Sequence, residues 1–225
     1  LSMGLKASAY FKLLKFRLSF TVAFSSAIGF VLGRPVANYW EIALVMIGGL
    51  LVTGSANIIN QIIEKDLDKL MKRTAKRPLP TGQVSVNEAI VVCVVTGVVG
   101  LAILASAFNL MAAAFSLLSL ILYGFAYTPM KRISPIGVFI GAIPGAMPPL
   151  IGWVAATGVL GVEAWILFGI QFIWQFPHFW AIAWVLDDDY KVSMVYRFAY
   201  NKMAGMNLNM EGWKNDSLNL KTLFI

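Results

Sequence analysis

Apolar runs recur along this chain at lengths that match the thickness of a bilayer. A transmembrane helix needs about 20 predominantly apolar residues. Only 13% of the 225 residues are charged, about half the share in an ordinary soluble domain. Because lipid offers no water to backbone N–H and C=O groups, long apolar runs of this kind form helices. The sequence therefore predicts an all-α, polytopic transmembrane helical bundle.

Six of the runs are long enough to cross a membrane. A basic, aromatic segment from Tyr10 to Arg17 precedes the first run, and Arg34-Pro35 ends it, because proline disfavours helix in the residue before it. The fifth run is rich in glycine and proline, which favours close helix packing; room for a lipid chain is the alternative. The predicted spans cover about residues 18–33, 39–64, 88–107, 110–127, 135–156 and 163–185.

Positive charge is distributed unevenly among the predicted loops. Of the 18 Lys and Arg residues, only Arg34 falls in the loops after the first, third and fifth spans. The positive-inside rule therefore places both ends of the chain in the cytoplasm. The same loops account for the net charge of +7 without a nucleic-acid partner, because anionic headgroups of the lipid bilayer attract them.

The second predicted span ends in a polar stripe. Asn60, Glu64 and Asp68 are four residues apart, so they share one helix face, with Asn57 one turn above. Basic residues follow at once: Lys69, Lys72, Arg73, Lys76 and Arg77. Two acids and an amide beside this charge suit a divalent cation that bridges to a phosphate group. Solvated charges at a helix end are the alternative interpretation.

A second acidic cluster, Asp187-Asp188-Asp189, follows the sixth span on the same predicted membrane face. Acids at membrane helices are costly and usually functional. Hard oxygen ligands without a Cys/His cluster in the sequence favour Mg²⁺. Arg73 and Arg77 are the best candidates for bidentate contacts to a diphosphate, and Lys131 with Arg132 could complete the clamp from the loop after the fourth span.

Four segments carry a family resemblance. The pattern Asn60-x-x-x-Glu64-x-x-x-Asp68 resembles the first Asp-rich motif of the UbiA superfamily of membrane prenyltransferases, with Glu64 where Asp is commoner. More specifically, residues 8–191 resemble its heme O synthase (protoheme IX farnesyltransferase) branch. The segments are YFKLLKFRLSF, NQIIEKDLDKLMKRTAKRPLPTGQVS, YTPMKRISPIGVFIGAIPGAMPPLIGWVAATG and WQFPHFWAIAWVLDDDY.

The resemblance implies a UbiA-like bundle around a lipid-open cavity capped on the cytoplasmic side of a bacterial inner membrane. Farnesyl diphosphate, held through Mg²⁺, would ionise to an allylic cation, the 2-vinyl group of heme B would attack it, and water would complete heme O. A downstream heme-modifying enzyme or the assembly of a heme–copper oxidase would receive the product.

By motif position, the resemblance assigns two sets of site residues. The metal-binding and catalytic set is Asn60, Glu64, Asp68, Asp188 and Asp189. The substrate-binding set is Arg73, Lys76, Arg77, Lys131, Arg132, His178 and Tyr190. Within the second set, His178 belongs to the family's Pro-His-Phe motif and is the candidate for contact with heme or its propionates.

The end of the chain departs from the family, whose members continue with further spanning helices. We therefore expect an incomplete prenyltransferase domain over residues 1–191 and a divergent tail, disordered or frameshifted, over 192–225. Three other interpretations stay open: a UbiA-type enzyme acting on a quinone precursor, an inactive fragment, and an ion-coupled transporter. The transporter requires carboxylates near the middle of the bilayer.

Overall fold

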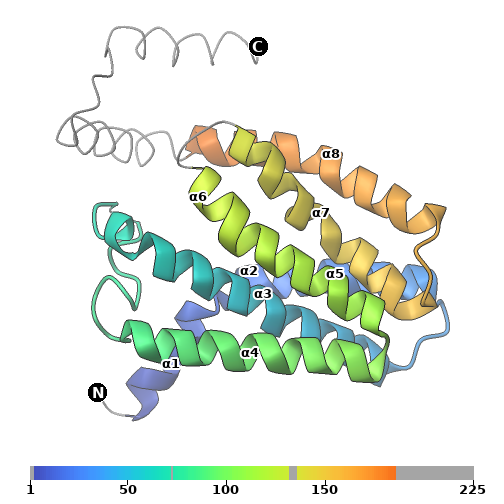
Figure 1. Cartoon of the computed structure of the whole chain (residues 1–225), viewed down its shortest axis with the longest axis horizontal. Coiled ribbons are helices and arrows are strands. Elements are labelled where there is room, and N and C mark those ends of the chain that lie inside the picture. Colours follow the sequence, from blue (N-terminus) through green and yellow to red (C-terminus); the bar gives the residue numbers. More distant parts are fainter. Residues whose placement is uncertain (1–2, 72, 132–135, 186–225) are drawn as a thin grey trace, which may run out of the picture. The chain divides into compact units, whose positions relative to one another are not determined.

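The computed structural model describes residues 3–71, 73–131 and 136–185, and every regular element in these ranges is helical (Figure 1). The all-α prediction is therefore confirmed. The elements are α1 (Met3–Leu13), α2 (Phe16–Gly33), α3 (Tyr39–Asp68), α4 (Val86–Ala107), α5 (Leu110–Ile121), the π-helical segment η1 (Leu122–Tyr127), α6 (Thr128–Met130), α7 (Ile136–Thr157) and α8 (Val162–Val185).

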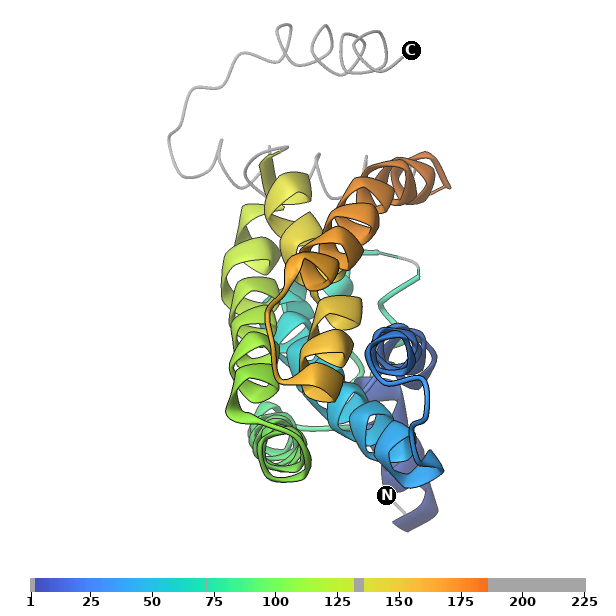
Figure 2. The ribbon, with the colours of Figure 1, turned by 90° about the vertical axis from the view of Figure 1, so that its right-hand side faces the viewer.

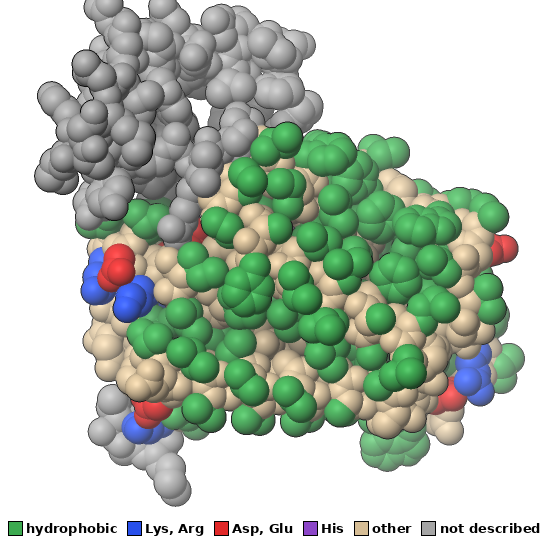
Figure 3. All heavy atoms as spheres, viewed as in Figure 1, with side chains coloured by type: hydrophobic (Ala, Val, Ile, Leu, Met, Phe, Trp, Pro, Cys, Tyr) green, Lys and Arg blue, Asp and Glu red, His purple; other side chains and the backbone are tan. Residues whose placement is uncertain are grey.

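Five stretches of the described residues are long and apolar enough to cross a membrane: α2, α3, α4, Leu110–Met130 and α7. The sixth predicted span forms α8, whose 24 residues also suffice in length; Gln171, Gln175 and His178 lower its mean hydropathy. Apolar side chains cover the face seen in Figure 3, and charged side chains gather at its two ends. This distribution is that of an integral membrane protein.

Local sequence signals fix several helix ends. A capping box of the Ser-x-x-Glu form begins α4: Ser85 Oγ accepts from the Glu88 N–H at 3.2 Å, and Glu88 Oε2 accepts from the Ser85 N–H at 2.9 Å. An unanticipated second box, of Asn38 and Glu41, begins α3. Asn109 begins α5 by accepting a hydrogen bond from the Ala112 N–H at 2.8 Å.

Helix α7 lies among α2, α5 and α8 (Figure 2). Its glycines allow α2 to approach closely, as the sequence predicts. A β-carbon on Gly152 would overlap the carbonyl oxygen of Ser26, and one on Gly29 of α2 would overlap that of Pro149. Backbone therefore packs directly against backbone at this crossing, the usual arrangement where small residues line helix contacts in membranes.

The amino-terminal segment differs from the prediction of one basic lead-in over residues 10–17. Helix α1 ends at Leu13, and the helical conformation is interrupted at Lys15 before α2 begins at Phe16. Leu13 is fully buried and packs with Ile58 and other apolar residues of a small core under α1. Lys6 adds an ion pair to Glu88 on α4 at 2.9 Å. These contacts dock α1 against α3 and α4.

Candidate functional site

One face of α3 is polar and buried. Asn57, Asn60, Gln61, Glu64 and Asp68 are each at most 8% exposed, although α3 crosses an apolar bundle. The prediction that the four-residue spacing aligns the acids and amides is confirmed. Burial of so many polar groups costs free energy unless partners compensate them, so their partners define what this face can do.

Both carboxylates of the stripe are paired with cations that are predicted to bind the diphosphate. Arg77 donates to Oδ2 of the fully buried Asp68 at 2.6 Å. Lys131 Nζ lies 2.9 Å from Glu64 Oε1. The structure therefore brings four predicted site residues from α3, the following loop and the end of α6 into two adjacent, partly buried ion pairs.

The loop after α3 turns back on the helix and so delivers Arg77 to Asp68. Thr74 Oγ1 donates to the Asp68 carbonyl at 2.9 Å, which ties the loop to the last turn of α3. The Arg77 N–H then donates to the Thr74 carbonyl at 2.9 Å. Arg73 and Lys76 lie on the exposed side of this loop. Among the described residues of the loop, the turn thus directs Arg77 toward the buried end of α3.

A π-helical segment joins the end of α5 to the stripe. Within η1 the hydrogen-bonding pattern widens, and Thr128 Oγ1 donates to the Tyr123 carbonyl at 2.8 Å. The Thr128 hydroxyl also accepts from Asn60 Nδ2 at 3.2 Å. π-Helical turns within helices occur frequently at functional sites. Here the turn places a hydroxyl that fixes the Asn60 amide.

Aromatic rings continue from the ion pairs to α8. Lys131 Nζ lies 5.2 Å from the centre of the Tyr127 ring, and the Tyr127 and Phe179 ring centres are 6.1 Å apart. His178 follows at 6.0 Å from Phe179 and stacks on Trp174 at 4.8 Å. His178 is therefore an aromatic neighbour of the polar site.

The described part of the stripe offers oxygen ligands for one metal ion. Asp68 Oδ1 is buried without a hydrogen-bond partner among the described residues, and a buried carboxylate oxygen left this way suits a cation. No group of three or more His, Cys, Asp or Glu that could hold a metal occurs within the described ranges. The predicted residues Arg132, Asp188, Asp189 and Tyr190 lie outside them.

One residue near the site was not predicted as part of it. Lys15, at the break between α1 and α2, interacts electrostatically with Arg77, Lys131, Glu64 and Asp68. Burial, and then the positive charges of Arg77 and Lys131, lower the pKa of Lys15 to about 7. The sequence signal was its position in the motif YFKLLKFRLSF, which carries part of the resemblance.

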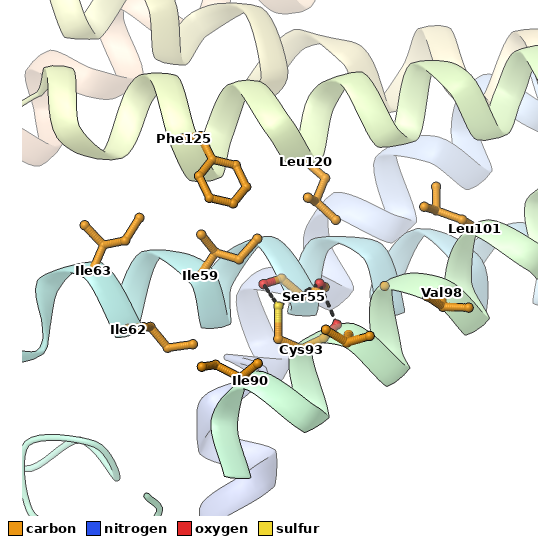
Figure 4. A pocket seen from close by; sticks show the side chains of 12 residues that line it. Ser55, Ile59, Ile62, Ile63, Ile90, Cys93, Val98, Leu101, Leu120 and Phe125 are labelled. Carbon is orange, nitrogen blue, oxygen red and sulfur yellow. Dashed lines mark hydrogen bonds between the residues drawn. The ribbon is translucent and has the colours of Figure 1, made fainter. Parts of the chain in front are cut away.

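The opposite face of α3 borders an apolar groove of about 430 Å³ between α3, α4 and the end of α5 with η1 (Figure 4). Ile59, Val98 and Phe125 line it. Its polar contact is local: Ser55 Oγ donates to the Cys93 carbonyl at 2.9 Å and lies 3.2 Å from Cys93 Sγ. The groove and the acidic stripe thus occupy different faces of α3.

Comparison with known proteins places the whole arrangement in one family. The UbiA prenyltransferase family matches residues 22–197. A protoheme IX farnesyltransferase of Cytophaga hutchinsonii is 57% identical over 190 residues, which cover 84% of this chain and 66% of that protein. The mitochondrial protoheme IX farnesyltransferase of Arabidopsis thaliana is 40% identical over 82% of this chain and 43% of its own length. The chain therefore spans less than two thirds of the length of these relatives.

Solved structures share the fold at low sequence identity. A digeranylgeranylglyceryl phosphate synthase superposes with a TM-score of 0.70 at 22% identity, covering 83% of this chain and 66% of that one. A UbiA homologue of Archaeoglobus fulgidus bound to GPP and Mg²⁺ superposes with a TM-score of 0.61 at 19% identity, covering 90% and 80%. With its helical bundle and its buried acidic stripe, the chain belongs to the UbiA prenyltransferase family.

Proposed function

We propose that this chain acts in heme O synthesis, transferring the farnesyl group of farnesyl diphosphate to the 2-vinyl group of heme B. One observation carries the donor half of the proposal: Glu64 and Asp68 are buried side by side on α3, each paired with a cation. The relatives named protoheme IX farnesyltransferase support the acceptor half. The carboxylates sit in the last turns of a 30-residue helix, where a mid-membrane proton relay would not place them.

Asn60, Glu64 and Asp68 would hold Mg²⁺ on the described side, with Asp188 and Asp189 as the second set. The free Oδ1 of Asp68 and the oxygen-only donor set fit this ion. Bound Mg²⁺ would supply positive charge that helps hold the diphosphate and stabilise it as it leaves. The A. fulgidus homologue bound to GPP and Mg²⁺ supports such a pairing here.

Arg77 and Lys131 would serve the diphosphate itself. In the structure they neutralise Asp68 and Glu64. On binding, the guanidinium and the ammonium would turn from the carboxylates to phosphate oxygens, and Arg77 would make bidentate contacts. Negative charge accumulates on the diphosphate as its bond to farnesyl carbon breaks. Fixed cations that meet this charge lower the barrier.

The outer basic residues and the aromatic end of α8 complete the proposed site. Arg73, Lys76 and Arg132 would attract the diphosphate from the cytoplasmic side. His178, next to the rings that lead to Lys131, would contact heme, and Tyr190 would bind substrate. Lys15, Arg77 and Lys131 share the end of the bundle that the positive-inside rule assigns to the cytoplasm.

Product analysis tests the proposal. Membranes that contain the chain are supplied with heme B, farnesyl diphosphate and Mg²⁺, and the extracted heme is analysed by mass spectrometry. We expect a species heavier by one farnesyl group and one hydroxyl group, because the water that adds to the cation loses a proton. The matched control is Asp68→Asn, which should give unmodified heme. Prenylation of an aromatic acid in place of heme would instead identify an enzyme that acts on a quinone precursor.

A further inference from the structure

The break between α1 and α2 holds its central residue in an unfavourable backbone conformation. Lys15 has φ 46° and ψ 54°, in the left-handed region, and is the only non-glycine residue with positive φ among those the structure describes. For a residue with a β-carbon this conformation is unfavourable, because the β-carbon comes too close to the following carbonyl oxygen. Glycine would adopt it without that cost, so something else must account for lysine here.

Side chains from α2 and α3 fix the two carbonyl groups just before the break. Gln61 Nε2 donates to the Leu13 carbonyl at 2.6 Å. Ser19 Oγ donates to the Leu14 carbonyl at 2.7 Å and accepts from Asn57 Nδ2 at 3.2 Å. The carbonyls that precede Lys15 are therefore held by Gln61 of α3 directly and by Asn57 of α3 through Ser19 of α2.

The amide of Gln61 holds the end of α1, but its burial costs free energy. Gln61 is 1% exposed, and its Oε1 has no hydrogen-bond partner in the described part of the chain. An unsatisfied buried acceptor lowers the stability of the fold, because the loss of its hydration is not compensated. An apolar residue of similar size would avoid this cost but would lose the bond to Leu13. The presence of an amide at this buried position points to a role in positioning the residues after Leu13.

The consequence of the break is the location of the Lys15 ammonium. It interacts with both ion pairs of the site, yet the described residues give it no ion pair or hydrogen bond. With Lys15 protonated, three cations face two carboxylates, and the cluster holds one positive charge in excess. This excess of positive charge disfavours the protonated form of Lys15 in the empty site, and it favours the binding of an anion.

We propose that Lys15 is a further anion-binding residue of this site, which contacts phosphate oxygens of the prenyl diphosphate, and that Gln61 is a positioning residue that acts through Lys15. The inference rests on the proposed function and adds a third cation to Arg77 and Lys131. It also gives a reason for the strained break: α1 ends where its last carbonyls are held by hydrogen bonds, and the side chain that follows lies within electrostatic range of the two carboxylates.

Binding of Mg²⁺ with inorganic pyrophosphate tests both parts, measured by calorimetry on the whole chain in phosphatidylcholine nanodiscs. We expect Lys15→Met to raise the Kd about tenfold or more, as for loss of a hydrogen bond to a charged group. Lys15→Arg should restore most of the affinity. Lys12→Met, an equal charge change at an exposed position of α1, should leave it unchanged. Lys15→Gly, which suits positive φ, serves if Lys15→Met inserts poorly.

The positioning role of Gln61 has its own signature. Gln61→Met should weaken pyrophosphate binding severalfold while the melting temperature changes little, because it removes one unpaired oxygen as it frees the Leu13 carbonyl. In a Lys15→Met background the same substitution should have no further effect on binding, since coupled residues are not additive. An equal loss in both backgrounds would show a general structural role and overturn the positioning claim.

The outcomes separate this inference from the proposed function. If wild type and Asp68→Asn both fail to bind magnesium pyrophosphate, the proposed site falls and the inference with it. If Asp68→Asn loses binding while Lys15→Met keeps it, only the inference is overturned. A repeat in nanodiscs with phosphatidylglycerol covers the other source of phosphate: loss of bound anionic lipid alone in Lys15→Met would assign Lys15 to headgroups and refute the proposal.

Discussion

Arg77 donates a 2.6 Å hydrogen bond to Asp68, whose side chain is fully buried at the end of α3. The two residues are nine positions apart in the sequence, and Thr74 ties the loop between them to α3. The pair therefore links the last turn of a membrane helix to the start of the Pro78–Pro80 segment. The second ion pair of the site, Glu64 with Lys131, links the same helix to the end of α6.

Removal of Arg77 should destabilise the fold more than removal of any exposed cation in the same loop. Arg77→Met leaves the Asp68 carboxylate buried without its partner, a change that costs about 3–5 kcal/mol. Lys76→Met, at an exposed position, should cost less than about 0.5 kcal/mol. Unfolding titrations in detergent measure both. The double variant Arg77→Met with Asp68→Asn should recover part of the loss, and strict additivity would contradict the pairing.

Metal-dependent binding should distinguish two aspartates only two positions apart. Asp68 faces the interior with a free Oδ1, whereas Asp66 is exposed and pairs with Lys69 at 3.2 Å. Asp68→Asn should weaken Mg²⁺-dependent pyrophosphate binding by about tenfold or more, because one charged ligand is lost. Asp66→Asn should change it less than twofold. Equal effects would mean that net charge, and not the helix face, governs binding.

Close approach of α2 and α7 should make Gly152 intolerant of a single methyl group. A β-carbon there would overlap the Ser26 carbonyl oxygen, so Gly152→Ala should force the helices apart at a cost of about 1–3 kcal/mol. Gly169 in α8 has no atom within 4 Å of the corresponding position. Gly169→Ala should therefore preserve stability or raise it through helix propensity. Melting temperatures in detergent compare the two, and a tolerated Gly152→Ala would contradict the observed packing.

Local sequence rules were sufficient for the helices and for the polar face of α3. Residues four apart share a helix face wherever a helix forms, so Asn60, Glu64 and Asp68 could be aligned without tertiary information. The capping box of Ser85 and Glu88 is local in the same way. Apolar length then predicted the ends of the spans to within a few residues, because lipid permits few alternatives to helix.

Pairing within the site required the tertiary structure. Among five basic residues after α3, the inward direction of Arg77 depends on a turn held by Thr74. The bond from Asn60 to Thr128 depends on a widened helical turn that no local propensity specifies. The Leu13 carbonyl, two residues before the left-handed Lys15, accepts its hydrogen bond from Gln61, 48 positions away in the sequence. Long-range hydrogen bonds of this kind leave no periodic signal.

Pyrophosphate affinity should fall as the pH rises above neutrality, in proportion to the loss of charge on Lys15. Burial, together with Arg77 and Lys131, lowers the pKa of Lys15 to about 7 in the free protein. A bound anion favours the charged ammonium and raises the pKa again, so above pH 7 binding must take up a proton. Linkage then weakens binding by up to about tenfold for each pH unit until the pKa of the bound state is reached.

Pyrophosphate also ionises in this pH range, and its ionisation affects the binding to every variant equally. Two variants separate the contribution of Lys15 from that effect. Lys15→Arg keeps its charge at every pH of the experiment, so its affinity should lack the decline seen in wild type. Lys15→Met should be weak throughout and equally flat. Calorimetry between pH 6 and pH 9, in buffers of different ionisation enthalpy, also counts the protons taken up directly. Parallel pH profiles for wild type and Lys15→Arg would show that Lys15 does not titrate at the site.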